Sequence, residues 1–129
     1  MLAAAFAALA QTPGAASAGI YGKAQAQRGA ALYAANCARC HGSSMEGLDV
    51  APPLTGQRFL SNWTNQSVAD LAKRVRTTMP LDMPGTLGLG DSADITTAIL
   101  AANGYPAGAA DLPPGNAAQS ALTIDGPVR

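Results

Sequence analysis

The chain has 129 residues, of which 48% are hydrophobic and only 5% aromatic, and eight basic side chains balance eight acidic ones. A net charge of zero gives no support to binding of nucleic acid or of an anionic membrane surface. A domain this small, with so few large apolar side chains, often needs a cofactor, metal or disulfide to complete its core. We therefore expect one domain built around a non-peptide group.

Residues 1–18 have the pattern of a signal peptide. An apolar run at 2–10 is followed by Ala-Ser-Ala at 16–18, the form of a cleavage site, which predicts a mature start near Gly19. The run is too short to cross a bilayer, which takes about 20 residues. One departure is that no Lys or Arg precedes Lys23. We expect export to the periplasm and no integral membrane span, the alternative being a disordered alanine-rich N-terminus.

Three segments carry the apolar spacing of helices, at 23–36, 67–78 and 91–103. The second begins with Ser67 and Asp70, which resemble a capping box. Loops rich in Gly and Pro separate the three segments, and no alternating strand pattern of useful length occurs. The sequence therefore predicts an all-α fold with three main helices.

Two further features are a glycine inside the first helix and the composition of the C-terminal segment. Gly29 lies inside the first helix, where it costs about 1 kcal/mol relative to Ala, and this predicts a close crossing with another helix. Residues 109–129 are rich in Pro, Gly and Ala. We expect them to form a mobile tail outside the fold.

Both cysteines and the only histidine lie in Cys37-Ala38-Arg39-Cys40-His41. The C-x-x-C-H form is typical of covalent haem attachment, because two thiols a helical turn apart can add to the two vinyl groups on one porphyrin edge. The next imidazole can then reach the iron. A thioredoxin-like pair needs a βαβ pattern, a zinc site needs four ligands, and a disulfide leaves His41 unexplained. The motif predicts one covalently bound haem c with His41 as proximal ligand.

No other histidine exists, which excludes a bis-histidine haem, and methionine is the other common choice for the second axial ligand of a six-coordinate haem. Met45 is too near His41 in sequence to reach the other face of the ring. Met79 and Met83 both precede a proline, which disfavours helical backbone. The second helix should therefore end at Thr78 and leave Met79 in the loop. Met79 is favoured, with Met83 and an open site as alternatives.

Four segments occur in a characteristic order: RGAALYAANCARCHG at 28–42, APPLTG at 51–56, VRTTMPLDMPGTLG at 75–88 and ILAANGYPAG at 99–108. Together they resemble the class I c-type cytochromes, and in particular small bacterial ones related to cytochrome subunits of quinoprotein dehydrogenases. The resemblance covers roughly residues 19–108. It implies a cytochrome c fold, in which helices and loops wrap around one covalently bound haem.

The resemblance also implies roles for single residues. Cys37 and Cys40 match the thioether cysteines and His41 matches the proximal ligand. Met79 matches the distal ligand in an Arg-x-x-Met-Pro pattern that starts at Arg76. These matches place haem iron between His41 and Met79.

Pro52 matches the proline whose carbonyl accepts the N–H of the proximal imidazole, with Pro53 as the alternative. Gly29 and Tyr33 match the crossing of the first and last helices. Relatives usually have an aromatic residue where this chain has Ala98, which predicts a looser crossing.

Two residues are candidates for contact with the haem propionates. Trp63 can donate through its indole N–H, although plain packing against the haem is an equal alternative. Arg58 can reach a propionate, although a solvated loop arginine is the more common state of such a residue.

We expect a monomeric periplasmic carrier of single electrons rather than an enzyme. Its redox partners would be a quinoprotein dehydrogenase or other donor, and a terminal oxidase or other cytochrome as acceptor. Two alternatives stay open. One is a haem-based sensor or enzyme with an open sixth site. The other is a docking subunit of a dehydrogenase complex, in which the tail or the cations Lys73, Arg74 and Arg76 would contact the rest of the complex.

Overall fold

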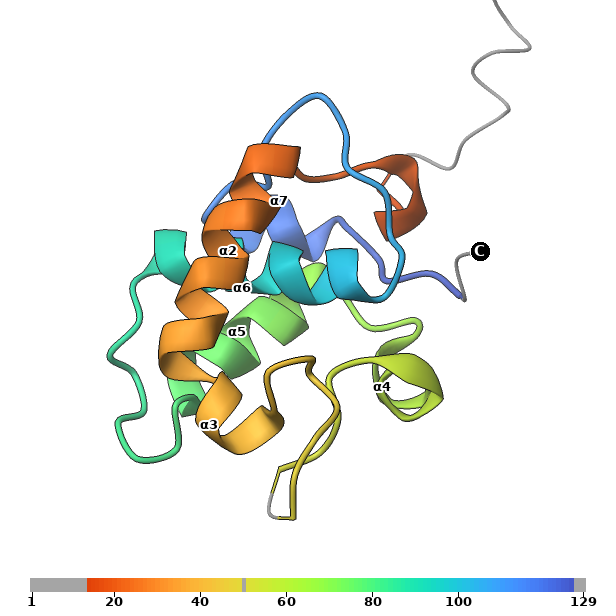
Figure 1. The fold of residues 1–129 in the computed structure, drawn as a ribbon. Helices are drawn as coiled ribbons and strands as arrows, with labels where there is room; N and C mark the ends of the chain where they lie inside the picture. The colour runs from red at the N-terminus through yellow and green to blue at the C-terminus, as the bar shows by residue number, and fades with distance from the viewer. Residues whose placement is uncertain (1–13, 50, 127–129) are drawn as a thin grey trace, which may run out of the picture.

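The computed structural model describes residues 14–49 and 51–126. Within these ranges the chain forms one 3₁₀ turn and six α-helices, connected by loops (Figure 1). They are η1 (Ala16–Ala18), α2 (Lys23–Asn36), α3 (Ala38–His41), α4 (Gly56–Trp63), α5 (Val68–Thr78), α6 (Leu89–Ala102) and α7 (Asn116–Ser120). The described residues make only isolated β-bridges and no sheet. The prediction of an all-α fold is confirmed.

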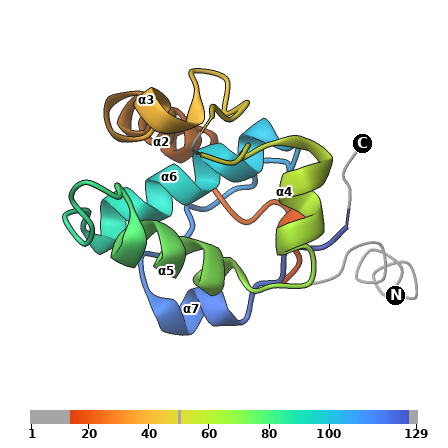
Figure 2. The same ribbon diagram turned by 90° about the horizontal axis from the view of Figure 1, so that it is seen from below.

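Helix α6 is the centre of the molecule. Figure 2 shows it between α2 on one side and α5 on the other, with α7 beyond α5. Ile95, Ile99 and Leu100 of α6 are at most 2% exposed, and so are Thr96 and Thr97. A helix that is buried nearly all round must be covered by other elements on several sides. Helices α2 and α5 supply that cover on two sides.

The crossing of α2 and α6 takes place at Gly29. A Cβ atom added to Gly29 would lie 1.8 Å from the carbonyl oxygen of Asp94 and 3.1 Å from Cβ of Ala98. The two helix backbones are therefore in direct contact, as the glycine predicts. The looser crossing expected from the small side chain of Ala98 is not found, because the contact is made by backbone atoms.

The three predicted helices are present with small changes at their ends. Helix α2 has the expected bounds, and α5 begins one residue later than expected, at Val68, with the Ser67 hydroxyl accepting from the Asp70 amide at 3.0 Å. Helix α6 begins at Leu89, two residues early, and ends at Ala102. Helices α3, α4 and α7 were not predicted, because four to eight residues give too few turns for a periodic pattern.

The segment after residue 108 is packed, which corrects the expected mobile tail at 109–129. Leu112 is 1% exposed and Ile124 is fully buried. The Gln25 side chain of α2 pairs with the Leu112 backbone through hydrogen bonds of 2.7 and 3.0 Å. Helix α7 packs on α5. A few apolar side chains and backbone bonds suffice to fold a segment whose composition suggests disorder; residues 127–129 lie outside the described part.

The N-terminal boundary of the domain also differs from the expectation. Residues 1–13, which hold most of the predicted signal peptide, lie outside the described residues. Ala16, however, is fully buried, and its amide donates to the Thr123 carbonyl at 2.9 Å. The Thr123 amide donates in turn to the Gly14 carbonyl at 2.6 Å. The folded domain therefore includes residues 14–18 and does not begin at Gly19.

Among the described helices, none combines the length and the apolar character needed to cross a membrane.

Candidate haem site

A cavity of about 820 Å³ lies among α3, α4, α5, α6 and the loops that follow α3 and α5. This volume is in the range of pockets that hold cofactors and other organic ligands, about 300–1,000 Å³. Large apolar side chains form much of its wall. They include Leu54, Phe59, Leu71, Val75, Ile95 and Ile99.

Both thiols line this cavity. Cys37 ends α2 with a non-helical backbone, so the chain turns there and starts the one-turn helix α3. The amides of Cys40 and His41 donate to the Cys37 carbonyl at 3.1 and 3.0 Å, which keeps the motif in a helical turn. Cys37 is half-buried, Cys40 is exposed, and neither is in a disulfide.

The thiol of Cys37 differs from the reactive thiol of a redox enzyme. Burial raises the pKa of Cys37, and the positive charge of Arg39 only partly opposes this. Thiols that exchange disulfides instead have a lowered pKa and a stable thiolate. The environment therefore does not favour thiol–disulfide exchange as the task of the motif.

His41 is 7% exposed and has a defined orientation. Its Nδ1 lies 2.8 Å from the carbonyl oxygen of Pro52. Because a carbonyl only accepts, Nδ1 carries the proton, and Nε2 is left with the free lone pair. Such a bond fixes the tautomer and raises the basicity of a ligating imidazole. Pro52, rather than Pro53, makes this contact.

The three methionines within the described residues have different surroundings. Met79 follows α5 with an extended backbone, φ −120° and ψ 150°, and lines the cavity. Met83 is 52% exposed and Met45 is 7% exposed within the core, and neither lines the cavity. The structure thus brings Met79 to the same space as Cys37 and His41.

Trp63 lines the cavity and Arg58 does not. Trp63 is the last residue of α4, and its ring centroid is 6.4 Å from that of Phe59. Arg58 lies on the same helix and is exposed. The structure does not bring Arg58 to the site.

Sequence reasoning did not place Arg74 at this site. The guanidinium carbon of Arg74 is 5.7 Å from the Trp63 ring centroid, and both residues line the cavity. Leu71 and Val75 also line it from the same helix. Residues spaced by three or four share a helix face, so Leu71 and Arg74 could have been assigned to one wall.

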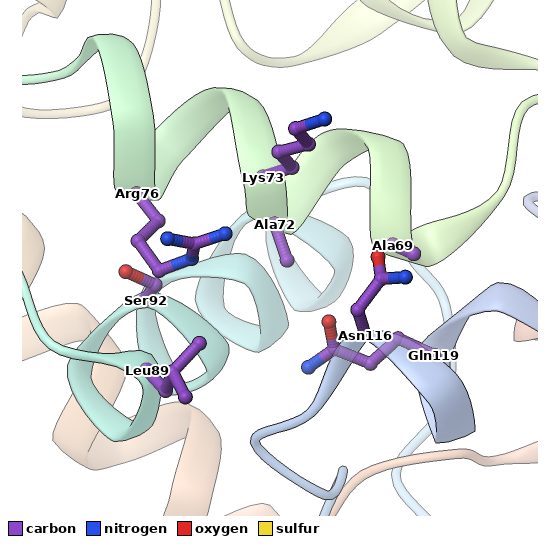
Figure 3. A pocket seen from close by; sticks show the side chains of 8 residues that line it. All are labelled: Ala69, Ala72, Lys73, Arg76, Leu89, Ser92, Asn116 and Gln119. Atoms are coloured by element: carbon purple, nitrogen blue, oxygen red, sulfur yellow. The ribbon is translucent and has the colours of Figure 1, made fainter. Parts of the chain in front are cut away.

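A second, small cavity lies between α5, the start of α6 and α7 (Figure 3). Polar side chains of Lys73, Arg76, Asn116 and Gln119 surround it. Its volume of about 20 Å³ holds about one water molecule. It is too small for a cofactor.

A family model described as cytochrome C oxidase, cbb3-type, subunit III matches residues 24–97, more than half of the chain. The chain belongs to this family. It therefore carries a cytochrome c domain, and the expectation of a c-type cytochrome is confirmed at this level. A cytochrome c domain implies covalently bound haem c and electron transfer.

Among solved structures, one chain of the sulfane dehydrogenase SoxCD from Paracoccus pantotrophus is similar to this cytochrome domain. The TM-score is 0.56 and the identity 33%, over 61% of this chain. The match spans only 43% of the SoxCD chain. A comparison with curated proteins finds no match.

The residues of the large cavity fit a haem c. Two thiols, one imidazole and one thioether are the donor set that this cofactor uses, and all four side chains line one cavity of suitable volume. Within the described ranges, no cluster of three or more His, Cys, Asp and Glu side chains is arranged to hold a bare metal ion.

Proposed function

We propose that this chain is a periplasmic carrier of single electrons that binds one haem c. The proposal depends on one observation above all. Cys37, Cys40 and His41 come from one segment and Met79 from another, and all four line the same largely apolar cavity. Bound haem c would supply an iron that alternates between the ferric and ferrous states.

Each side chain has a separate task in this proposal. Cys37 and Cys40 form the covalent attachment, which prevents loss of the cofactor. His41 binds through Nε2, and the Pro52 carbonyl holds its ring in position. Met79 supplies a soft thioether that raises the potential. The apolar wall limits the access of water and so contributes to the potential.

We place the protein outside the cytoplasm, as is typical of c-type cytochromes. The packing of Gly14 and Ala16 against residue 123 argues against cleavage after residue 18, so the proposed location depends on the haem motif and not on that cleavage site. Electron transfer requires a donor, such as a quinoprotein or other dehydrogenase, and an acceptor, such as an oxidase or another cytochrome. Such encounters are transient and bury little surface.

Optical spectra of the oxidised and reduced protein, exported together with haem-maturation factors, test the proposal. We expect a low-spin haem with the weak absorption band of methionine bound to ferric iron. Met79→Ala should remove this band, and the matched variant Met83→Ala should keep it, because Met83 lies outside the cavity. A high-spin wild-type haem that binds added ligands at once would instead favour a sensor or enzyme.

A second candidate function is supported by the likeness to a chain of a sulfane dehydrogenase. In this alternative the chain is the electron-accepting subunit of a dehydrogenase complex. Size-exclusion chromatography of the protein from its native cells distinguishes the two cases. A free carrier elutes alone, whereas a subunit elutes with a larger catalytic chain.

A further inference from the structure

We propose that the ion pair between Arg39 and Asp82 holds the loop that carries Met79 in place, and so sets how readily Met79 leaves its position. Nη2 of Arg39 contacts both carboxylate oxygens of Asp82, at 2.7 and 2.8 Å. This inference rests on the proposed function, because it assigns Met79 to the iron. It adds two positioning residues that do not touch the iron themselves.

The position of the pair gives it this task. Arg39 lies between the two cysteines, and Asp82 follows Met79 by three residues. Both residues line the large cavity. The pair therefore joins the segment that holds one side of the cofactor directly to the segment that carries the distal ligand.

The loop has few other attachments. Apart from the helical bonds at its ends and the two bonds to Arg39, the hydrogen bonds of residues 79–87 stay within the loop. They join the Met83 amide to the Pro80 carbonyl at 2.9 Å and the Thr86 hydroxyl to the Met83 carbonyl at 2.8 Å. Pro80 and Leu87 are buried. Within the described chain, the bonds of Asp82 to Arg39 are thus the hydrogen bonds that tie the loop to another segment.

The size of the effect follows from the exposure of the pair. The two side chains are 49% and 62% exposed, and exposed pairs contribute only about 0.2–1 kcal/mol. This is small against the stability of a whole domain. The contribution of the pair is a larger share of the free energy needed to open this one loop, because such opening breaks only local contacts. Because Nη2 contacts both carboxylate oxygens, we expect the upper part of this range, about 0.4–1 kcal/mol, which corresponds to about two- to fivefold faster opening.

The test compares Asp82→Asn with the wild type and with Asp111→Asn. Asp111 is a matched control, because it pairs with Arg28 at 3.0 Å, is 56% exposed, and lies away from the cavity. The first measurement is the rate at which added neutral imidazole replaces the Met79 sulfur on the ferric iron of the holoprotein. We expect about a two- to fivefold increase in Asp82→Asn and no change in Asp111→Asn. An equal rate in Asp82→Asn and wild type would overturn the proposal.

Salt and a charge exchange separate the ion pair from a general loss of packing. Added salt screens an exposed pair, so it should accelerate displacement in the wild type and leave Asp82→Asn unchanged. Exchange of the two charges, Arg39→Asp with Asp82→Arg, should restore the slow rate. If this double variant does not incorporate haem, the comparison of salt dependence between wild type and Asp82→Asn decides alone. Equal acceleration by salt in the two proteins would then overturn the proposal.

Amide hydrogen exchange in the same holoproteins gives a readout that is independent of the iron ligand. Exchange of residues 81–87 should be about two- to fivefold faster in Asp82→Asn and unchanged in Asp111→Asn. A wild-type spectrum without the methionine band would contradict the proposed function, whereas the exchange data would still show whether the pair holds the loop. Unchanged exchange would overturn the tether even if Met79 is the ligand.

Discussion

At the scale of single residues, Arg74 and Trp63 place a positive charge at the edge of an otherwise largely apolar cavity. The guanidinium carbon lies 5.7 Å from the Trp63 ring centroid, within the range of a cation–π contact. A planar guanidinium held over a ring can still present its N–H groups to a carboxylate. We therefore propose Arg74, which lines the cavity, rather than Arg58, which does not, as the candidate to pair with the propionates of a bound haem.

Replacing Arg74 tests this assignment. Arg74→Gln removes a positive charge from the wall of the cavity proposed to hold the haem, which would favour the ferric form. We expect the midpoint potential to fall by on the order of tens of millivolts, given that a tenfold change in a one-electron equilibrium is about 59 mV. Redox titration measures it. Arg58→Gln removes the same charge outside the cavity and should cause a smaller shift; equal shifts would contradict a specific role for Arg74.

At the scale of elements, the glycine at the crossing of α2 and α6 determines how closely these two helices, the longest described, can approach each other. Gly29 has no Cβ, and this lets its backbone approach the Asp94 carbonyl. The spacing of apolar residues was enough to predict these two helices and α5. It could not show that the contact is made by backbone, because the partner of a small residue is not encoded near it in sequence.

Gly29→Ala should destabilise the protein, although Ala is the better helix former. The new Cβ would overlap the Asp94 carbonyl, and such overpacking costs about 1–3 kcal/mol. Gly90→Ala in α6 is the matched control, because a Cβ there meets nothing within 4 Å. We expect it to be neutral or slightly stabilising. Urea unfolding monitored by circular dichroism measures both, and a Gly29→Ala variant as stable as Gly90→Ala would refute the tight crossing.

At the scale of the whole molecule, buried tyrosines join distant parts of the chain. The Tyr21 hydroxyl donates to the Tyr105 carbonyl, and the Tyr105 hydroxyl donates to the Asp125 carbonyl at 2.6 Å. The Tyr33 hydroxyl donates to the Gly42 carbonyl beside the haem motif. Burial raises the pKa of all three tyrosines, to about 12 for Tyr33.

These pKa values predict a loss of stability in alkali. An unfolded tyrosine ionises near pH 10, so above this pH the folded state holds more protons than the unfolded state. The stabilisation is complete below pH 10 and is lost as the pH rises toward 12. Urea unfolding between pH 8 and 11.5 measures it. Tyr33→Phe should be less stable at pH 8 by about 0.5–1.5 kcal/mol but should depend less on pH; an unchanged pH slope would contradict the raised pKa.

Local properties of the chain were sufficient to predict several parts of the site. The C-x-x-C-H motif and the end of α5 before the Met79–Pro80 bond each depend on neighbours in sequence. The apolar periods of α2, α5 and α6 are local as well. The hydrogen bond to Pro52 was expected from the family resemblance, and the structure shows it.

Contacts between distant segments decided the rest. The packing of residues 14–18 against 123–125, the position of Arg74 at the cavity and the pair of Arg39 with Asp82 all join residues that are far apart in the chain. A short segment with one or two apolar side chains looks disordered by composition, and it folds only because a complementary surface exists elsewhere. That surface is formed by the other helices, so only the tertiary structure shows which charges face the cavity and which ends of the chain belong to the core.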